Sequence, residues 1–222
     1  MKAVIFDMDG VLINSEPLWK KSGMLILNHY GVPITYDEMM SMVGIPVSCM
    51  IDRACQLYNK NDLDKSKIEK DLFNRGVELI LTEKLLMDGV IECLDLLVSK
   101  NIKIGIASAS PLSFLLKIVE QCGIANYFDH ISSAEDMPYN KPHPMVYLNA
   151  AEKLNVSSKE CIGIEDSKTG MIAVKAASMK CVVMPSYNEY NHTYWDAADW
   201  KIKSLQECCA LINSDTLIKA KN

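Results

Sequence analysis

The stretch AVIFDMDGV, residues 3–11, decides the fold of this chain. Its first four residues are apolar and the run ends abruptly in Asp7, which is typical of a fully buried strand at the centre of a parallel sheet. Such a strand delivers the Asp7 carboxylate to the edge of the sheet where ligands bind. Similar brief apolar runs predict further strands at 102–107 (IKIGIA), 161–164 (CIGI) and 181–184 (CVVM), with a weaker candidate at 130–132.

Helical patterns alternate with these apolar runs. The clearest predicted helix has Ser110 as its N-cap and Pro111 at its first helical position, and it stops at Gly123. Two more helices are predicted at 145–154 and 167–177. Because strand and helix alternate, we expect an α/β fold: a Rossmann-like parallel sheet with helices on both faces.

Residues 15–86 interrupt this alternation. They show helical periodicity with no strand-like run between the helices, and the turn-rich segment YNKNDLDKS at 58–66 predicts a loop among them. We therefore expect an inserted helical domain at 15–86, and a core domain made of residues 1–14 and 87–222.

Charge and composition exclude some classes of binding partner. The 222 residues carry 23 Lys and Arg against 28 Asp and Glu, a net charge of −5, with no basic stripe that could neutralise a nucleic-acid backbone. The eight cysteines lack the spacing of a zinc site, so we expect reduced thiols. No signal peptide and no apolar run of roughly 20 residues is recognisable. We expect a cytoplasmic protein without membrane or nucleic-acid partners, and a monomer as the default.

Residues that could carry chemistry through a side chain or a backbone N–H follow three of the predicted strands. They are Asp7 and Asp9, then Ser108 and Ala109, then Glu165 and Asp166. Because the carboxyl ends of parallel strands meet at one edge, we expect them to form one site. Acids at two strand ends beside a hydroxyl favour Mg²⁺ together with a phosphoryl group. Lys141, in NKPHP at 140–144, is the predicted counter-charge.

Each of these residues also has a plain structural interpretation. An aspartate before a glycine is common in turns, and Ser108 would suit a turn or a cap. Acids such as Glu165 are favoured at helix starts in any case, and a single lysine usually lies on the surface. Their order along the chain is what favours the chemical interpretation.

That order resembles a known family. DMDGV at 7–11, ASAS at 107–110, KP at 141–142 and IED at 164–166 look like the four ordered motifs of the haloacid dehalogenase (HAD) superfamily. More narrowly, the chain resembles the β-phosphoglucomutase-like branch, which has a helical cap domain inserted after the first motif. NSEPLW at 14–19, ASASPL at 107–112, residues 133–148 and EDSKTGM at 165–171 are most similar to bacterial hexitol and 2-deoxyglucose-6-phosphate phosphatases.

The resemblance implies a role for each residue of the set. Asp7 would be the nucleophile that forms an aspartyl phosphate, and Asp9 would be the general acid and base. Mg²⁺ would be held by the Asp7 carboxylate, the Asp9 backbone carbonyl and Asp166, with Glu165 either a further ligand or a group that orients one. The Ser108 hydroxyl, the Ala109 N–H and Lys141 would bind the phosphoryl oxygens.

Three functions remain open at this point. The favoured one is a Mg²⁺-dependent phosphatase for small sugar or sugar-alcohol phosphates, such as 2-deoxyglucose 6-phosphate or a hexitol phosphate. A sugar-phosphate mutase is the alternative, although β-phosphoglucomutases carry a histidine at the position matching Trp19 and an arginine matching about Val47, for which Arg53 could substitute. The third is a catalytically silent binding or regulatory protein, which the intact motif residues disfavour.

Overall fold

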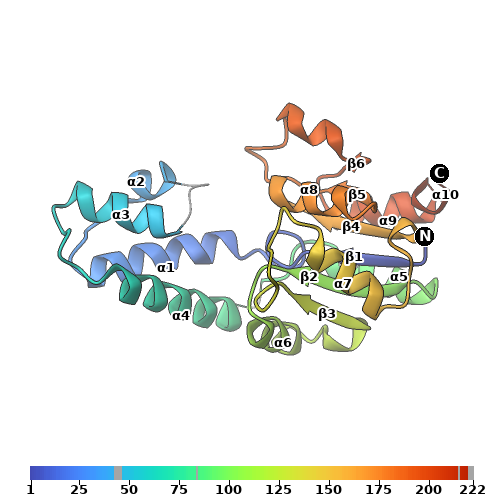
Figure 1. Ribbon diagram of the computed structural model, residues 1–222, viewed down its shortest axis with the longest axis horizontal. Coiled ribbons are helices and arrows are strands. Elements are labelled where there is room, and N and C mark those ends of the chain that lie inside the picture. Colours follow the sequence, from blue (N-terminus) through green and yellow to red (C-terminus); the bar gives the residue numbers. More distant parts are fainter. Residues whose placement is uncertain (43–46, 84, 215, 220–222) are drawn as a thin grey trace. The chain divides into compact units, whose positions relative to one another are not determined.

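The computed structural model describes residues 1–42, 47–83, 85–214 and 216–219 (Figure 1). The strands are β1 (Ala3–Phe6), β2 (Lys103–Ser108), β3 (His130–Ser133), β4 (Cys161–Glu165), β5 (Lys180–Val183) and β6 (Trp200–Lys201). The α-helices are α1 (Glu16–His29), α2 (Tyr36–Met40), α3 (Val47–Leu57), α4 (Lys65–Glu83), α5 (Val90–Ser99), α6 (Leu112–Gln121), α7 (Met145–Lys153), α8 (Lys168–Ala176), α9 (Leu205–Asn213) and α10 (Thr216–Lys219). Short 3₁₀ helices are η1 (Ala125–Tyr127), η2 (Ser158–Glu160) and η3 (Thr193–Ala197).

A parallel sheet organises the larger part of the chain. Over the described residues its six strands lie in the order β3-β2-β1-β4-β5-β6, and every pairing is parallel. Ala3 of β1 lies opposite Lys103 on one side and Cys161 on the other, so β1 is central as predicted. The four predicted strands and the weaker candidate at 130–132 are all confirmed. Among the described residues, no helix combines the length and apolarity needed to cross a membrane.

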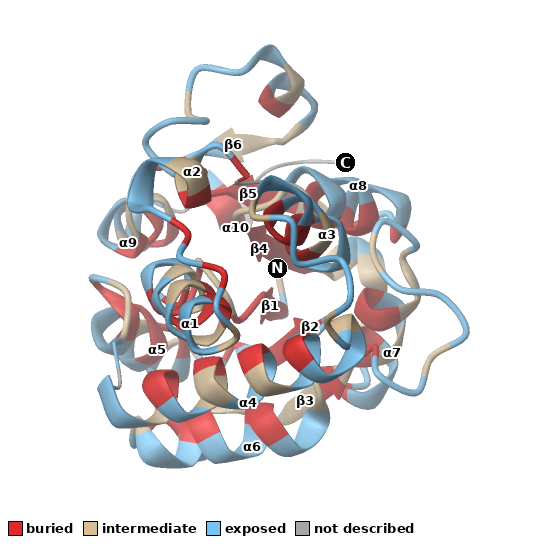
Figure 2. Ribbon diagram, turned by 90° about the vertical axis from the view of Figure 1, so that its left-hand side faces the viewer, coloured by how far each residue is buried: buried red, intermediate tan, exposed pale blue. Residues whose placement is uncertain are grey.

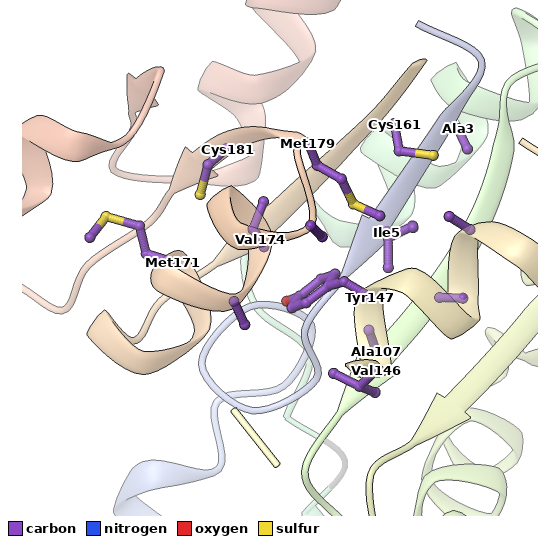
Figure 3. Close-up of a cluster of buried hydrophobic side chains, with 14 of the residues drawn as sticks. Ala3, Ile5, Ala107, Val146, Tyr147, Cys161, Met171, Val174, Met179 and Cys181 are labelled. Carbon is purple, nitrogen blue, oxygen red and sulfur yellow. The ribbon is translucent and has the colours of Figure 1, made fainter. Parts of the chain in front are cut away.

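Helices cover both faces of this sheet, which confirms the predicted α/β class. α5 and α9 pack together on one face, while α7 and α8 pack on the other (Figure 2). The core under α7 and α8 contains Ile5 of β1, Tyr147 of α7 and Val174 of α8 (Figure 3). The helices are amphipathic, and Figure 2 shows buried residues on one side of α6 and exposed residues on the other.

The predicted start of one helix is wrong. α6 begins at Leu112 and not at Pro111, and Pro111, with ψ near 139°, is its N-cap. Ser110 does not cap the helix, because its hydroxyl donates to Asp9 Oδ2 at 3.1 Å. The Leu112 N–H is instead satisfied by Glu135 Oε2 at 3.2 Å.

The chain divides into two compact units, Met1–Asn14 with Lys84–Asn222, and Ser15–Glu83. The described residues of the second unit contain helices α1 to α4 and no strand. α1 and α4 pack closely because Gly76 leaves room for the Trp19 ring, which a Cβ would overlap. The sequence places the end of the insertion at 86, whereas the division follows Glu83, since Leu85 and Met87 bond to Asn14 and Leu12 of the first unit.

Candidate active site

A cavity of about 280 Å³ lies at the carboxyl ends of the central strands. It is lined by Asp7, Asp9, Ser108, Ala109, Asn140, Lys141, Asp166, Ser167 and Thr169. Six of the seven predicted site residues are in that lining, and the seventh, Glu165, is wholly buried beneath it. The topology therefore brings together residues that are far apart in the chain.

The turn after β1 shapes one side of the cavity. The Asp7 N–H donates to Ile164 O at 2.9 Å, which extends the β1–β4 pairing into the site. The chain then turns tightly, with Gly10 at φ +75°, a region that residues with side chains rarely adopt. A Cβ at Gly10 would overlap the Asp166 carboxylate. Glycine is thus required here both by its backbone angle and by the closeness of the second acid.

Lys141 is the cation at the centre of the site. Its side chain is only 8% exposed, and its ammonium donates to Asp7 Oδ1 at 2.6 Å, Glu165 Oε1 at 2.7 Å and Ala107 O at 3.0 Å. An ammonium has three N–H donors, so all three are used. The charge of one lysine is therefore shared between two buried carboxylates.

Glu165 is fully buried and accepts several hydrogen bonds. Oε1 accepts from Lys141 and from the Tyr147 hydroxyl at 2.8 Å. Oε2 accepts from the Ser167 hydroxyl at 3.0 Å and from the N–H groups of Asp166 and Ser167, both at 3.2 Å. The carboxylate lies against Gly170 of α8, where a Cβ would overlap it. These contacts fix the orientation of Glu165.

The site carries more negative than positive charge. Burial raises the pKa of Asp7 from 3.8 to about 7, and repulsion by Glu165 and Asp9 adds to this while Lys141 opposes it. Burial also raises the pKa of Asp166 well above its usual value, with Asp7 and Glu165 adding to the effect. For Lys141, burial lowers the pKa, but Asp7 and Glu165 outweigh it and the net pKa is raised. A bound cation would relieve this crowding.

The donor set fits a hard divalent cation. Carboxylate oxygens of Asp7, Glu165 and Asp166 all lie within 4.8 Å of one another. Hard oxygen donors are the ligands that Mg²⁺ prefers, and it commonly combines one or two carboxylates with substrate phosphate and water. These three acids could therefore hold Mg²⁺.

The turn after β2 offers donors of the kind that bind phosphoryl oxygens. Ser108 is buried, and its hydroxyl accepts from the Ser110 N–H at 3.1 Å. Ser110 in turn donates to Asp9 Oδ2, which orients that carboxylate. Ser110, although it stands within the ASAS motif, was predicted only as a helix cap.

Other residues of the site carry weaker signals in the sequence. Asn140 directly precedes Lys141 and accepts from its backbone N–H at 2.7 Å, so its position alone could have suggested it. Ser167 caps α8 by accepting from the Gly170 N–H at 3.0 Å, as a residue before a predicted helix can. Tyr147 lies within residues 133–148, but its position there suggests only core packing, because a large ring in a buried helix position needs no special chemistry. Its hydroxyl meets Glu165 only because folding brings the two residues together.

The chain is similar to known phosphate-handling enzymes. A family model described as haloacid dehalogenase-like hydrolase matches residues 4–184. Hexitol phosphatase B of Escherichia coli (strain K12) is 37% identical over 209 residues, covering 94% of each chain. A phosphorylated carbohydrates phosphatase of Thermotoga maritima is 30% identical, covering 85% of this chain and 88% of the relative. The crystal structure of β-phosphoglucomutase from Clostridium difficile superposes with a TM-score of 0.71 at 28% identity, covering 96% and 99% of the two chains.

Proposed function

Because this chain belongs to the haloacid dehalogenase-like hydrolase family, we propose that it is a Mg²⁺-dependent phosphatase that acts on small sugar or sugar-alcohol phosphates. The observation that carries the proposal is the contact of Lys141 with both Asp7 and Glu165, beside Asp166 and the donors of the β2 turn. A buried nucleophilic carboxylate, a fixed cation and hydrogen-bond donors are what phosphoryl transfer to an aspartate needs.

In the proposed reaction Asp7 is the nucleophile. One Asp7 oxygen attacks phosphorus in line with the leaving sugar oxygen, which forms an aspartyl phosphate and divides one difficult displacement into two easier ones. Lys141, the Ser108 hydroxyl and the Ala109 N–H stabilise the phosphoryl oxygens. Since Asp7 must be ionised to attack, and its burial favours the neutral form, the Lys141 contact at 2.6 Å is part of its activation.

Asp9 is the proposed general acid and base. It protonates the leaving oxygen and then removes a proton from the water that hydrolyses the aspartyl phosphate. The Ser110 hydroxyl, which donates to Asp9 Oδ2, restricts the directions in which that carboxylate can turn. The same residue therefore serves both half-reactions from a defined position.

Mg²⁺ is proposed to bind the Asp7 and Asp166 carboxylates and the Asp9 backbone carbonyl. When bound, it would neutralise charge on the carboxylates and on the phosphoryl group. Glu165 is either a further ligand or a group that orients one. Both of its oxygens already accept hydrogen bonds, Oε1 from Lys141 and Tyr147 and Oε2 from Ser167 and two backbone N–H groups, which favours the orienting role.

The substrate class follows from the relatives. The hexitol phosphatase and the carbohydrate phosphatase both support a phosphorylated sugar or polyol, such as 2-deoxyglucose 6-phosphate or a hexitol phosphate. The unit Ser15–Glu83 is the proposed cap domain, which in this branch of the family covers the leaving group. The core domain supplies the chemistry.

A mutase is the second candidate, favoured by the likeness to β-phosphoglucomutase. Against it stands Trp19, the residue at the position where these mutases carry a histidine. In this chain the Trp19 ring stacks on Phe73 with ring centroids 5.7 Å apart. Trp19 therefore contributes to packing between α1 and α4. A mutase must keep water away from its aspartyl phosphate, and the loss of a polar cap contact favours transfer to water.

A phosphate-release screen tests the proposal. Hexose, hexitol, nucleotide and glycolate phosphates would be assayed with Mg²⁺ and with EDTA, alongside a mutase assay with β-glucose 1-phosphate and its bisphosphate activator. We expect release from hexose or hexitol phosphates with Mg²⁺ only, and none from Asp7→Asn, whose amide is a poor nucleophile. Interconversion of sugar phosphates without free phosphate would establish the mutase instead.

A further inference from the structure

Tyr147 joins the hydrophobic core to the proposed active site. It projects from α7, is fully buried and lies in the cluster that includes Ile5, Ala107 and Val174 (Figure 3). At the end of its ring, the hydroxyl donates to Glu165 Oε1 at 2.8 Å. The ring itself lies 5.1 Å from the Lys141 ammonium, within the range of a cation–π contact. One side chain thus touches both members of the Lys141–Glu165 pair.

Core packing explains the ring of Tyr147 but does not explain its hydroxyl. A phenylalanine would fill the same apolar space without placing a polar group in it. A buried hydroxyl is tolerated only when it finds a partner, and here the partner is the carboxylate that holds Lys141. The Tyr147 hydroxyl is therefore accounted for by its contact with Glu165 and not by the apolar cluster.

Glu165 Oε1 accepts from the Tyr147 hydroxyl and from Lys141, so the two donors fix that oxygen from two directions. Lys141 has a long flexible chain, and its ammonium would otherwise be held by Asp7 and by the Ala107 carbonyl. Once Asp7 carries a phosphoryl group, it no longer offers a free carboxylate. Of the two carboxylates that pair with Lys141, only Glu165 then remains to hold it beside the phosphoryl oxygens.

We propose that Tyr147 is a positioning residue, which acts through Glu165 to keep the Lys141 ammonium aimed at Asp7 and at the phosphoryl group. The inference rests on the proposed function, because it assigns Tyr147 a part in phosphoryl transfer. It also makes a claim about the unliganded protein, namely that Tyr147 limits the motion of the Lys141 ammonium.

The variant Tyr147→Phe removes the hydroxyl and keeps the ring. We expect kcat to fall about 10-fold, as for the loss of a hydrogen bond to a charged group, while KM changes less than about 3-fold. The matched control is Tyr127→Phe, which removes a hydroxyl that donates to Asp95 Oδ1 at the same distance, 2.8 Å, on the exposed surface. Its kcat should equal that of the wild type. An unchanged kcat in Tyr147→Phe would contradict the catalytic part of the inference.

The double variant shows whether Tyr147 acts through Glu165. In a Glu165→Gln background, Tyr147→Phe should lower kcat less than about 2-fold further, because the carboxylate it orients is gone. A full additional 10-fold loss would show that the hydroxyl acts by another route and would overturn the inference. Thermal unfolding of each variant separates this result from loss of folded protein.

A measurement on the free protein separates this inference from the proposed function. The exchange of the Lys141 ammonium protons with water is followed by NMR, with the signal assigned by its absence in Lys141→Arg. We expect slow exchange in the wild type and at least 10-fold faster exchange in Tyr147→Phe, with no change in Tyr127→Phe. Faster exchange in a protein that releases phosphate from no substrate would defeat the proposed function and leave the positioning role standing. Equal exchange rates, with phosphatase activity present, would overturn the positioning role alone.

Discussion

At the scale of single residues, the positive charge of Lys141 offsets the negative charges of the site. It is the cation in contact with Asp7 and Glu165, and each of these carboxylates is almost or wholly buried. Removing one partner from a buried ion pair leaves an uncompensated charge, which costs far more than breaking a pair on the surface. The lysine therefore has two functions that a mutation would affect together, one in stability and one in catalysis.

The variant Lys141→Met tests both functions. We expect the free energy of unfolding without Mg²⁺ to fall by roughly 3–5 kcal/mol, and phosphate release to fall at least about 100-fold. Urea unfolding and a phosphate assay give the two values. The control is Lys2→Met, whose partner Glu160 and own side chain are 42% and 67% exposed, and it should change stability by less than about 1 kcal/mol. If the two substitutions lowered the free energy of unfolding equally, the buried ion pair would contribute no more to stability than the exposed one.

The raised pKa of Asp7 predicts how stability varies with pH. Its pKa is 3.8 ordinarily and about 7 in the folded protein, so between these values the folded state binds more protons than the unfolded state. Stability without Mg²⁺ should therefore fall as pH rises from about 5 to about 7, by up to roughly 1.4 kcal/mol per pH unit for this one group. Urea unfolding in EDTA measures it. Asp7→Asn should reduce the slope without abolishing it, because burial also raises the pKa of Asp166. A stability that rises over this interval in the wild type would contradict the assignment.

At the scale of elements, two glycines keep the acids close together. Gly10 in the turn after β1 leaves room for Asp166, and Gly170 in α8 leaves room for Glu165. The turn and the helix can approach the acids only because these positions lack a side chain. The geometry of the site is therefore encoded partly in residues that have no chemistry of their own.

The variant Gly10→Ala measures this steric requirement. Its Cβ would meet the Asp166 carboxylate, so we expect the Mg²⁺ concentration for half-maximal activity to rise at least about 10-fold, with a loss of about 1–2 kcal/mol in stability from the positive φ. Gly123→Ala is the control, because Gly123 also has a positive φ, +70°, but nothing lies within 4 Å of an added Cβ. It should lose comparable stability and keep its Mg²⁺ requirement. If both variants kept that requirement, the overlap with Asp166 would be irrelevant to metal binding.

The elements also show how far prediction from sequence can go. The strands were predictable because buried parallel strands are short apolar runs, and their carboxyl ends had to share one edge. The start of α6 could not be predicted in this way. Ser110 is a residue type that often caps a helix, but its hydroxyl donates to Asp9, which lies 101 residues away in the sequence. The Tyr147 hydroxyl is a similar case, because its partner Glu165 is set by packing between α7 and β4. Local pattern predicts elements, whereas contacts between distant elements decide which polar atoms meet.

At the scale of the whole molecule, the strand order determines when the sheet can be completed during synthesis. β1 leaves the ribosome before the other strands of the sheet, but its two neighbours are residues 103–106 and 161–164. At roughly 5–20 residues per second, its second edge stays unpaired for about 8–30 s. Helices α1 and α4 contact each other within residues 15–83 and become available much earlier. The apolar strand that precedes Asp7 therefore waits longest for its partners, and we expect β1 to be the edge through which a nascent chain most readily aggregates.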